Sequence, residues 1–328
     1  MKIFVNMIDD PTTRSFIPDY VKEKLCSMGE VEFNTTDHRF KGEELAAHLQ
    51  DKDVLVTGWG QPLIKKEDLG SVKVIMHTGG STGGIVDLGV FDTDVKVISG
   101  NAYYAESVAE GTLAYMLYAL RDMAKYSNAL SKEGNWLPTY TEGLLDQTVG
   151  IVSVGAISRK LIPMLSMFRV KLKVFSKSRD MEFAKKWNFE YTDLDDIFST
   201  CKIISVHTAK CPETDNMIND HHFKLIQPGS IFINTSRGSV IDEAALIENL
   251  KENRFKAVID VYQREPLTAE SGLVGLDNAM LFPHQAGPTY DRRKFITEKL
   301  LEDVQRHFNG EEMENIITKE VAERMTII

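Results

Sequence analysis

The sequence predicts an α/β protein with two Rossmann-like domains, each built on a parallel sheet. Short β-rich runs alternate with helical patterns along almost the whole chain, which is typical of parallel α/β architecture. The 328 residues are enough for about two domains. A second series of alternating elements starts at Val149 with a strand, a turn and a helix. We expect one flavodoxin-like domain and one doubly wound domain.

Four strands are expected in the first third of the chain. They lie at residues 2–5, 53–57, 73–76 and 95–99. A long helix is predicted from about Ser107 to Lys125, because apolar residues recur there at helical spacing. We place the domain division near Gly100, with this helix bridging the two halves. The final helix, from about Thr289 to Phe308, is expected to return to the first domain.

The second series contains six expected strands separated by helical stretches, which fits a doubly wound nucleotide-binding sheet. They lie at residues 149–154, 172–175, 202–206, 230–234, 257–260 and 279–282.

Composition excludes several classes of function. The net charge of -10 argues against nucleic acid or an anionic membrane as the main partner. No apolar run reaches the roughly 18 residues of a membrane span. The three cysteines form no CxxC motif, so we expect a reducing compartment and a cytoplasmic protein. The pair His221-His222 is more typical of a solvated helix start than of a metal site, and we expect no metal.

The turn at residues 150–158 occupies the strand–turn–helix position of a dinucleotide-binding loop. Only the middle glycine of the GxGxxG pattern, Gly155, is present, and Ser153 and Ser158 hold the outer positions. Alone, this segment favours an ordinary turn. The backbone N–H groups of Ala156 and Ile157 would still be free to receive a phosphate at the helix N-terminus.

The segment after the next strand bears on the choice of dinucleotide. An NAD enzyme usually carries an acidic residue there for the ribose hydroxyls, but this chain has Ser176, Lys177 and Arg179. Without a carboxylate and with two cations, the segment would attract a 2′-phosphate, which favours NADP over NAD. The alternative is an ordinary solvated loop.

Three runs in the last third carry candidate catalytic groups: residues 234–238, 260–266 and 283–287. Arg237 offers a bidentate fork for a carboxylate. His284 can transfer a proton near neutral pH, and Glu265 can orient its ring. Taken singly, each has a structural explanation, as a surface ion pair, a loop carboxylate or a structural histidine. Together they suit the reduction of the ketone of a 2-oxo acid.

With these runs in order, the chain resembles the D-2-hydroxyacid dehydrogenase family, which includes glyoxylate/hydroxypyruvate reductases and phosphoglycerate dehydrogenase. Segments 106–114, Trp136 and 207–214 add to the resemblance. It implies that Arg237 binds the substrate carboxylate and carbonyl, that His284 is the acid/base and that Glu265 pairs with it. It also implies a substrate-binding domain of residues 1–100 completed by 289–328, a dinucleotide-binding domain of residues 101–288, and a homodimer built around the 107–125 helix.

The resemblance assigns further residues to the ligands. The loop at 77–84 departs from the family's Gly-x-Gly-x-Asp pattern, yet the backbone of Gly79, Gly80 and Ser81 is expected to bind the substrate carboxylate, and His77 beside it to influence specificity. The residues expected on the cofactor side are Gly155, Ala156, Ile157, Ser176, Lys177, Arg179, Thr112, Thr208, Pro212, Thr235, Asp260 and Gly287.

The sequence therefore predicts an oxidoreductase that interconverts a small 2-oxo acid and its D-2-hydroxy acid with NADP or NAD. Two alternatives stay open. A dinucleotide-sensing scaffold without turnover, as in the C-terminal-binding-protein corepressors, is favoured by the serines at 153 and 158. An enzyme of the same chemistry with an unusual substrate is favoured by the 77–84 loop.

Overall fold

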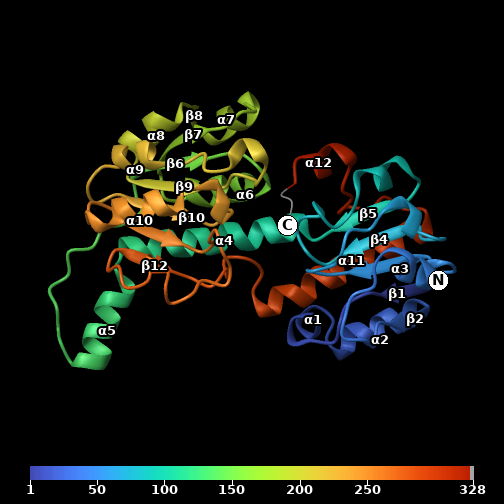
Figure 1. Ribbon diagram of the computed structural model, residues 1–328. Coiled ribbons are helices and arrows are strands. Elements are labelled where there is room, and N and C mark those ends of the chain that lie inside the picture. Colours follow the sequence, from blue (N-terminus) through green and yellow to red (C-terminus); the bar gives the residue numbers. More distant parts are fainter. Residues whose placement is uncertain (326–328) are drawn as a thin grey trace. The chain divides into compact units, whose positions relative to one another are not determined.

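A computed structural model of the protein describes residues 1–325. They form two compact units (Figure 1). Unit 1 contains residues 1–104 and the C-terminal segment from Pro288, and unit 2 contains residues 105–287. The domain boundaries expected from the sequence, near residue 100 and before residue 289, stay a prediction. Both units carry an all-parallel sheet between helices, which confirms the predicted fold class.

Unit 1 is built on five strands in the order β2-β1-β3-β4-β5, the flavodoxin-like order. They are β1 (Lys2–Val5), β2 (Glu30–Phe33), β3 (Val54–Thr57), β4 (Val74–His77) and β5 (Lys96–Ser99). The sequence predicts all of them except β2. This strand lies at the edge of the sheet and alternates Glu30 and Glu32 with apolar residues, so it contains no continuous apolar run.

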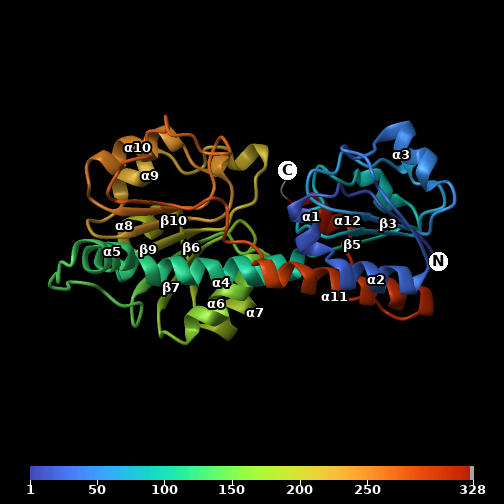
Figure 2. The same cartoon turned by 90° about the horizontal axis from the view of Figure 1, so that it is seen from below.

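Helices cover both faces of this sheet. One apolar cluster joins α2 and α11 to the sheet and another joins α3 to the opposite face (Figure 2). Helix α11, which corresponds to the predicted helix at 289–308, packs beside α1 and α2, although almost the whole chain separates them. It is not the final helix, because the short helix α12 follows it. The helices are α1 (Pro11–Phe16), α2 (Asp19–Met28), α3 (Gly42–Leu49), α11 (Tyr290–Asn309) and α12 (Lys319–Glu323), with short 3-10 turns η1 (Lys66–Asp68) and η2 (Leu88–Asp92).

Unit 2 is built on seven parallel strands in the order β12-β11-β10-β9-β6-β7-β8. They are β6 (Thr148–Val152), β7 (Lys171–Phe175), β8 (Glu190–Tyr191), β9 (Ile203–Val206), β10 (Ile231–Asn234), β11 (Lys256–Ile259) and β12 (Ala279–Leu281). Only β8, a two-residue edge strand, is missing from the prediction. The order reverses between β6 and β9, and ligands of such sheets bind outside the carboxyl ends of the strands at this point.

The helices of unit 2 lie in two layers (Figure 2). One apolar cluster packs α4, α6 and α7 against the sheet, and a second packs α8, α9 and α10 against the other face. The bounds are α4 (Asn101–Leu120), α5 (Met123–Glu133), α6 (Ala156–Ser166), α7 (Met181–Trp187), α8 (Leu194–Thr200), α9 (Asp220–Leu225) and α10 (Glu243–Lys251), with η3 (Pro212–Thr214) and η4 (Gly238–Val240). Within residues 1–325, no helix is long and apolar enough to span a bilayer.

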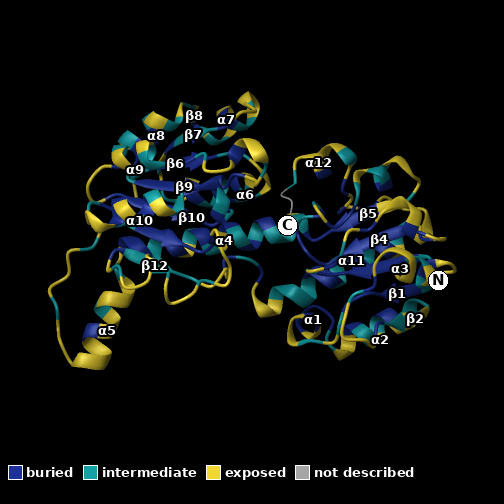
Figure 3. Ribbon diagram, in the orientation of Figure 1, coloured by how far each residue is buried: buried dark blue, intermediate teal, exposed yellow. Residues whose placement is uncertain are grey.

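The helix predicted from Ser107 to Lys125 is wrong at both ends. Helix α4 starts at Asn101, earlier than predicted. It stops at Leu120 because Asp122 adopts a left-handed conformation (φ 46°), and a separate helix, α5, follows. We call residues 121–143 the arm. Within the described part of the chain the arm adds no side chain to the clusters that pack on the sheet of unit 2, and most of it is exposed (Figure 3).

Candidate active site

His284 and Glu265 form a direct pair in unit 2. The Nδ1 atom of His284 lies 2.7 Å from Oε2 of Glu265, whose carboxylate accepts the hydrogen bond. The other carboxylate oxygen, Oε1, accepts from the backbone N–H of Tyr262 at 3.0 Å. The His284 side chain is 48% exposed, and its Nε2 atom has no hydrogen-bond partner within residues 1–325. The pair therefore fixes the ring and leaves Nε2 available for proton exchange.

Asp260 holds the turn that carries His284. Its Oδ1 accepts hydrogen bonds from the N–H of Gln285 (2.9 Å) and the hydroxyl of Tyr115 (2.8 Å), and its Oδ2 accepts from the N–H of Ala286 (3.0 Å). These bonds hold His284 in a left-handed conformation (φ 51°) that is costly for a residue other than glycine. Asp260 is only 1% exposed, so its carboxylate is occupied by the protein itself. Burial, reinforced by the charge of Asp260, raises the pKa of Tyr115.

Arg237 follows β10 at the start of η4. Its Nη1 donates to the carbonyl of Ser236 at 2.7 Å, and most of the side chain is buried. Burial lowers the pKa of Arg237, and the negative charge of nearby Glu265 opposes that shift. Arginine stays protonated throughout the working range of a protein, so the site holds a fixed positive charge beside the Glu265–His284 pair.

Two features hold the Arg237 loop in place. The side chain of Asn234 accepts from the N–H of Ser236 (3.0 Å) and donates to the carbonyl of Arg237 (3.1 Å). A Cβ atom at Gly238 would lie 1.9 Å from the carbonyl carbon of Tyr262, so only glycine permits this approach of the two chain segments. The ends of β10, β11 and β12 thereby bring Arg237, Glu265 and His284 to one edge of the sheet.

The turn between β6 and α6 has the geometry of a phosphate loop despite its serines. Ser153 adopts a glycine-like conformation (φ 80°). The buried hydroxyl of Ser158 donates to the carbonyl of Ser153 at 2.6 Å. A Cβ atom at Gly155 would meet nothing within 4 Å, so the space above the turn is open. No side chain caps the first turn of α6, and the backbone at Gly155 and Ala156 is exposed. The turn therefore fits an anionic ligand.

Buried polar atoms without partners lie at the end of β9, beside the reversal of strand order. Nδ1 of His207 and Oγ1 of Thr208 make no hydrogen bond in the described part of the chain. The other ring nitrogen of His207 lies 2.9 Å from Oγ of Ser205, and burial lowers the pKa of His207 to about 3, so the ring is neutral. Unsatisfied buried groups are costly, and a bound dinucleotide at this edge would offer them partners.

The remaining residues predicted on the cofactor side differ in how far they are buried. Thr112 and Thr235 are buried and hydrogen-bonded to each other (3.0 Å), which ties α4 to the end of β10. Ser176 is buried at the end of β7, whereas Lys177 and Arg179 are exposed, with Arg179 5.8 Å from the centre of the Tyr191 ring. Pro212 is exposed in η3, and Gly287 follows the His284 turn.

The glycine loop predicted to bind the substrate carboxylate follows β4 in unit 1. Gly79 and Gly80 are buried and Ser81 is half-buried. A Cβ atom at Gly79 would lie 2.3 Å from Nε2 of His77, so the loop backbone packs directly on the imidazole. His77 is fully buried, which lowers its pKa to about 3, and its Nδ1 lies 3.0 Å from the hydroxyl of Thr57. The ring is thus a neutral support beneath the loop.

Sequence reasoning did not find Tyr115 and Tyr262. Tyr115 bonds Asp260, and Tyr262 supplies the N–H that holds Glu265. A signal for Tyr115 is present in the sequence, because it follows the predicted residue Thr112 by one helical turn and so shares its face of the helix.

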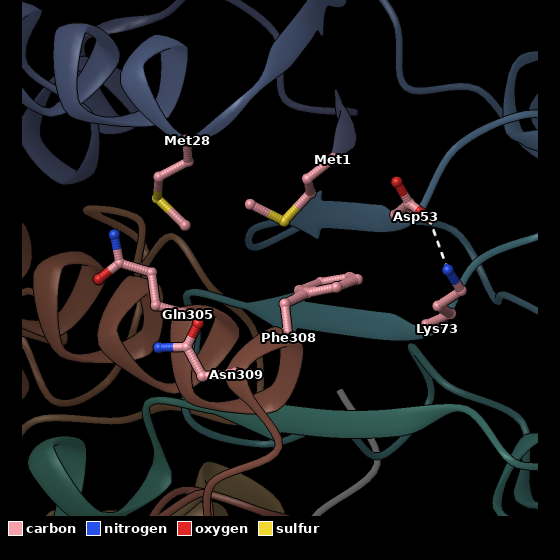
Figure 4. Close-up of a pocket in the computed structure, with 7 residues that line it drawn as sticks. All are labelled: Met1, Met28, Asp53, Lys73, Gln305, Phe308 and Asn309. Carbon is pink, nitrogen blue, oxygen red and sulfur yellow. Dashed lines mark hydrogen bonds and ion pairs between the residues drawn. The ribbon is translucent and has the colours of Figure 1, made fainter.

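The described residues also enclose a pocket of about 640 Å³ that contains none of the predicted site residues (Figure 4). Its lining residues are Met1, Met28, Asp53, Lys73, Gln305, Phe308 and Asn309. Asp53 and Lys73 precede β3 and β4, so the pocket lies at the amino ends of the strands. The chemistry that we infer belongs to the carboxyl ends, and we place no site in this pocket.

Comparisons with known proteins show which family the chain resembles. Residues 113–286 match the family model of the D-isomer specific 2-hydroxyacid dehydrogenase, NAD binding domain. The chain is 31% identical over 226 residues to the glyoxylate reductase of Thermococcus litoralis, covering 66% of this chain and 68% of that protein. It is 29% identical over 301 residues to the D-3-phosphoglycerate dehydrogenase of Methanocaldococcus jannaschii, covering 89% of this chain but only 56% of that longer protein.

A solved D-lactate dehydrogenase with NAD+ from Lactobacillus jensenii has the same fold. It aligns with a TM-score of 0.77 at 22% identity, covering 97% of this chain and all of that one. The family model covers more than half of the chain, and the glyoxylate reductase matches across two thirds of its own length. The chain therefore belongs to the family of D-isomer specific 2-hydroxyacid dehydrogenases.

Proposed function

We propose that this protein is a NAD(P)-dependent oxidoreductase that interconverts a small 2-oxo acid and its D-2-hydroxy acid. The observation that carries the proposal is the 2.7 Å contact between His284 and Glu265 beside the largely buried Arg237. A half-exposed imidazole with one nitrogen held by a carboxylate and the other free is suited to acid/base work. Family membership supports the same reaction class.

Each side chain has a defined part in the proposed reaction. Arg237 binds the carboxylate of the 2-oxo acid and stabilises the negative charge that develops on its carbonyl oxygen. His284 gives the proton from Nε2 to that oxygen during reduction and takes it back during oxidation. Glu265 holds Nδ1–H and so keeps Nε2 directed to the reacting oxygen. A nicotinamide dinucleotide, when bound, supplies or accepts the hydride at C2 of the substrate.

The residues that would hold the dinucleotide lie along the carboxyl edge of the unit 2 sheet. The free N–H groups of Ala156 and Ile157 bind the pyrophosphate, with Gly155 allowing its approach. Thr208, Pro212 and Gly287 border the same edge. Asp260, Thr112 and Thr235 act through the backbone that they fix, since their side chains are buried and bonded to protein groups.

A reductase assay tests this function. We expect oxidation of the reduced dinucleotide, followed at 340 nm, with glyoxylate, hydroxypyruvate, pyruvate or 2-oxoisocaproate as acceptor. A scaffold protein, favoured by the serines at 153 and 158, would bind the dinucleotide in a fluorescence titration and turn over none of the acids. That result would replace the enzyme proposal.

The chain is proposed to prefer NADPH to NADH. None of the four residues directly after β7 (176–179) is acidic, and Lys177 makes no hydrogen bond within residues 1–325. The double variant Lys177→Ala/Arg179→Ala is expected to raise KM for NADPH about 10- to 100-fold, since charged hydrogen bonds contribute about 1.5–3 kcal/mol. KM for NADH should stay unchanged in this double variant. The control Lys185→Ala on α7 should change neither KM for NADPH nor KM for NADH. An equal loss with both dinucleotides would refute the preference.

The arm is proposed to form part of a homodimer interface. Trp136 and Tyr140 are 83% and 85% exposed, and Met123 and Leu130 add apolar surface on α5. Large exposed aromatic residues on a segment outside the core are typical of an interface. We expect a mass near twice 37.0 kDa by light scattering, and a shift to monomer in Trp136→Ala/Tyr140→Ala. The control Met181→Ala removes another exposed apolar residue (66%), from α7, and should leave the mass unchanged. A monomeric wild type would contradict the dimer.

A further inference from the structure

Unit 1 contains an arginine without a partner. The guanidinium of Arg39 forms no hydrogen bond or ion pair with any other group of residues 1–325, and its Nε atom is buried. A partly buried guanidinium that lacks an acceptor is costly, because it loses water without gaining a protein partner. Such a group indicates a place for an anionic ligand.

The main chain on both sides of Arg39 is held by buried amide side chains. Asn34 donates to the carbonyl of His38 at 2.7 Å. Asn6 donates to the carbonyl of Phe40 at 2.9 Å and accepts from its N–H at 3.0 Å. A third buried amide, Gln61, bonds the side chain of Asn6 at 2.9 Å. This network fixes the backbone of Arg39 while leaving its charged end unpaired, which is the arrangement of a preorganised binding group.

Arg39 lies where ligands of a parallel sheet bind. Asn6, Asn34 and Gly58 directly follow β1, β2 and β3, so the network occupies the carboxyl edge of the unit 1 sheet. A Cβ atom at Gly60 would lie 3.3 Å from Nη1 of Arg39, so the guanidinium packs against the loop after β3.

Trp59 connects this loop to the glycine loop after β4. Its ring lies 5.8 Å from the His77 ring and 5.6 Å from the Tyr104 ring, and its Nε1 donates to the Tyr104 hydroxyl at 2.7 Å. His77 supports Gly79, and a Cβ atom at Gly80 would lie 3.0 Å from the ring of Tyr104. Trp59 thus lies in the loop that packs against Arg39 and contacts the two rings that pack against the glycine loop.

Asp37 and Glu44, two carboxylates close to Arg39 in the sequence, both contact the ring of His38. The ring of His38 lies 3.2 Å from Asp37 through Nδ1 and 3.3 Å from Glu44 through Nε2. Neither carboxylate forms an ion pair with Arg39, whose positive charge is therefore available to a ligand.

We propose that Arg39 binds a second anionic group of the substrate, so that the protein acts on 2-oxo acids carrying a carboxylate or phosphate at the end remote from the reacting carbonyl. This inference rests on the proposed function and on the expectation from the sequence that the glycine loop also binds the substrate carboxylate. Arg39 then selects the class of substrate, and Trp59 lies beside the chain that joins the two anionic groups.

Steady-state kinetics test the proposal with pairs of 2-oxo acids that share a carbon chain and differ in the second anionic group. 2-Oxoglutarate and phosphohydroxypyruvate carry the second anion, whereas 2-oxovalerate and hydroxypyruvate lack it. We expect wild type to show a higher kcat/KM with at least one anionic member, and Arg39→Gln to lower that value about 10- to 100-fold, as for loss of a charged hydrogen bond. The kcat/KM values for 2-oxovalerate and hydroxypyruvate, which carry a single carboxylate, should be unchanged in Arg39→Gln. Arg39→Lys should restore part of the preference. A response of 2-oxoglutarate alone to Arg39→Gln would indicate that the second group is a carboxylate. A response of phosphohydroxypyruvate alone would indicate a phosphate.

The control Arg324→Gln removes an exposed arginine of unit 1 that pairs with Glu320. It should change none of these values. Equal kcat/KM for acids with one and with two anionic groups would refute the inference while the proposed function stands. An Arg39→Gln variant that still prefers the acids with two anionic groups would refute it as well.

A calorimetric titration keeps the two proposals separate. If no acid is turned over, binding of 2-oxoglutarate and 2-oxovalerate to wild type and Arg39→Gln is compared directly. Tighter binding of 2-oxoglutarate that is lost in Arg39→Gln supports the site even without hydride transfer. Equal binding of the two acids, or no binding of either, overturns it.

Discussion

Replacing His284 with glutamine is expected to lower kcat for 2-oxo acid reduction by about 10²- to 10⁴-fold, the usual contribution of general acid–base catalysis. Glutamine retains hydrogen-bonding ability near Glu265 but cannot deliver a proton to the developing alkoxide. The side chain is half-exposed, so its loss should affect folding little. Stopped-flow and steady-state measurements at 340 nm, together with dinucleotide titration, test this result.

The chain offers a matched control for His284. His221 and Asp195 form another histidine–carboxylate pair in unit 2, at 3.0 Å and largely exposed. His221→Gln should leave kcat unchanged. Glu265→Gln should give an intermediate loss, because it removes the charge but preserves an acceptor for Nδ1–H. If His284→Gln keeps kcat within about threefold of wild type, where general acid–base catalysis would contribute at least 10²-fold, another group supplies the proton.

Replacing Arg237 with lysine is expected to lower kcat/KM for the 2-oxo acid by about 10²- to 10³-fold, as for loss of a main charge-stabilising donor. Lysine keeps the positive charge but cannot make the two parallel bonds of a guanidinium to a carboxylate. Both kcat and KM should respond, because Arg237 is proposed to contact the substrate carboxylate and the reacting carbonyl. KM for the dinucleotide should change little.

Arg254→Lys serves as the control for this substitution. Arg254 is also partly buried in unit 2, and it donates to the carbonyl of Ile226 at 2.8 Å. Its replacement should reduce thermal stability without changing kcat/KM. A comparable loss of activity in Arg254→Lys, or normal activity in Arg237→Lys, would contradict the role of Arg237. Melting curves of both variants separate misfolding from loss of substrate binding.

The apolar strands were predictable because their pattern is local. Runs such as Ile231–Asn234 and Val54–Thr57 are buried on both faces and contain almost only apolar residues. The edge strands β2 and β8 were not found, because one side of each meets solvent and carries glutamates. The break in the long helix at Asp122 also escaped prediction. This residue forms an ion pair with Lys256 on β11, a contact that no helical periodicity contains.

In the candidate site, too, local motifs were predictable from the sequence, whereas long-range contacts were not. The motifs around Arg237, Glu265 and His284 were visible because each stands beside a strand end with its own turn residues. The expected contact of Asp260 with the cofactor stays a prediction, and the structure adds that its carboxylate bonds Tyr115 and the turn after His284. A sequence motif identifies the residue at a position, whereas its hydrogen-bond partners depend on segments that pack there.

The parallel α/β class, most of the strands and the order of the motifs could be read from the amino-acid sequence alone, because hydrophobic periodicity and turn residues act over a few positions. The three-dimensional packing shows what holds the acid/base turn and that the buried Nε of Arg39 lacks a partner among the described residues. The Tyr115–Asp260 bond joins residues 145 positions apart, and the amides around Arg39 come from three strand ends separated by up to 55 positions. Such contacts arise when strands far apart in the chain end at one edge of a sheet, and no local pattern specifies them.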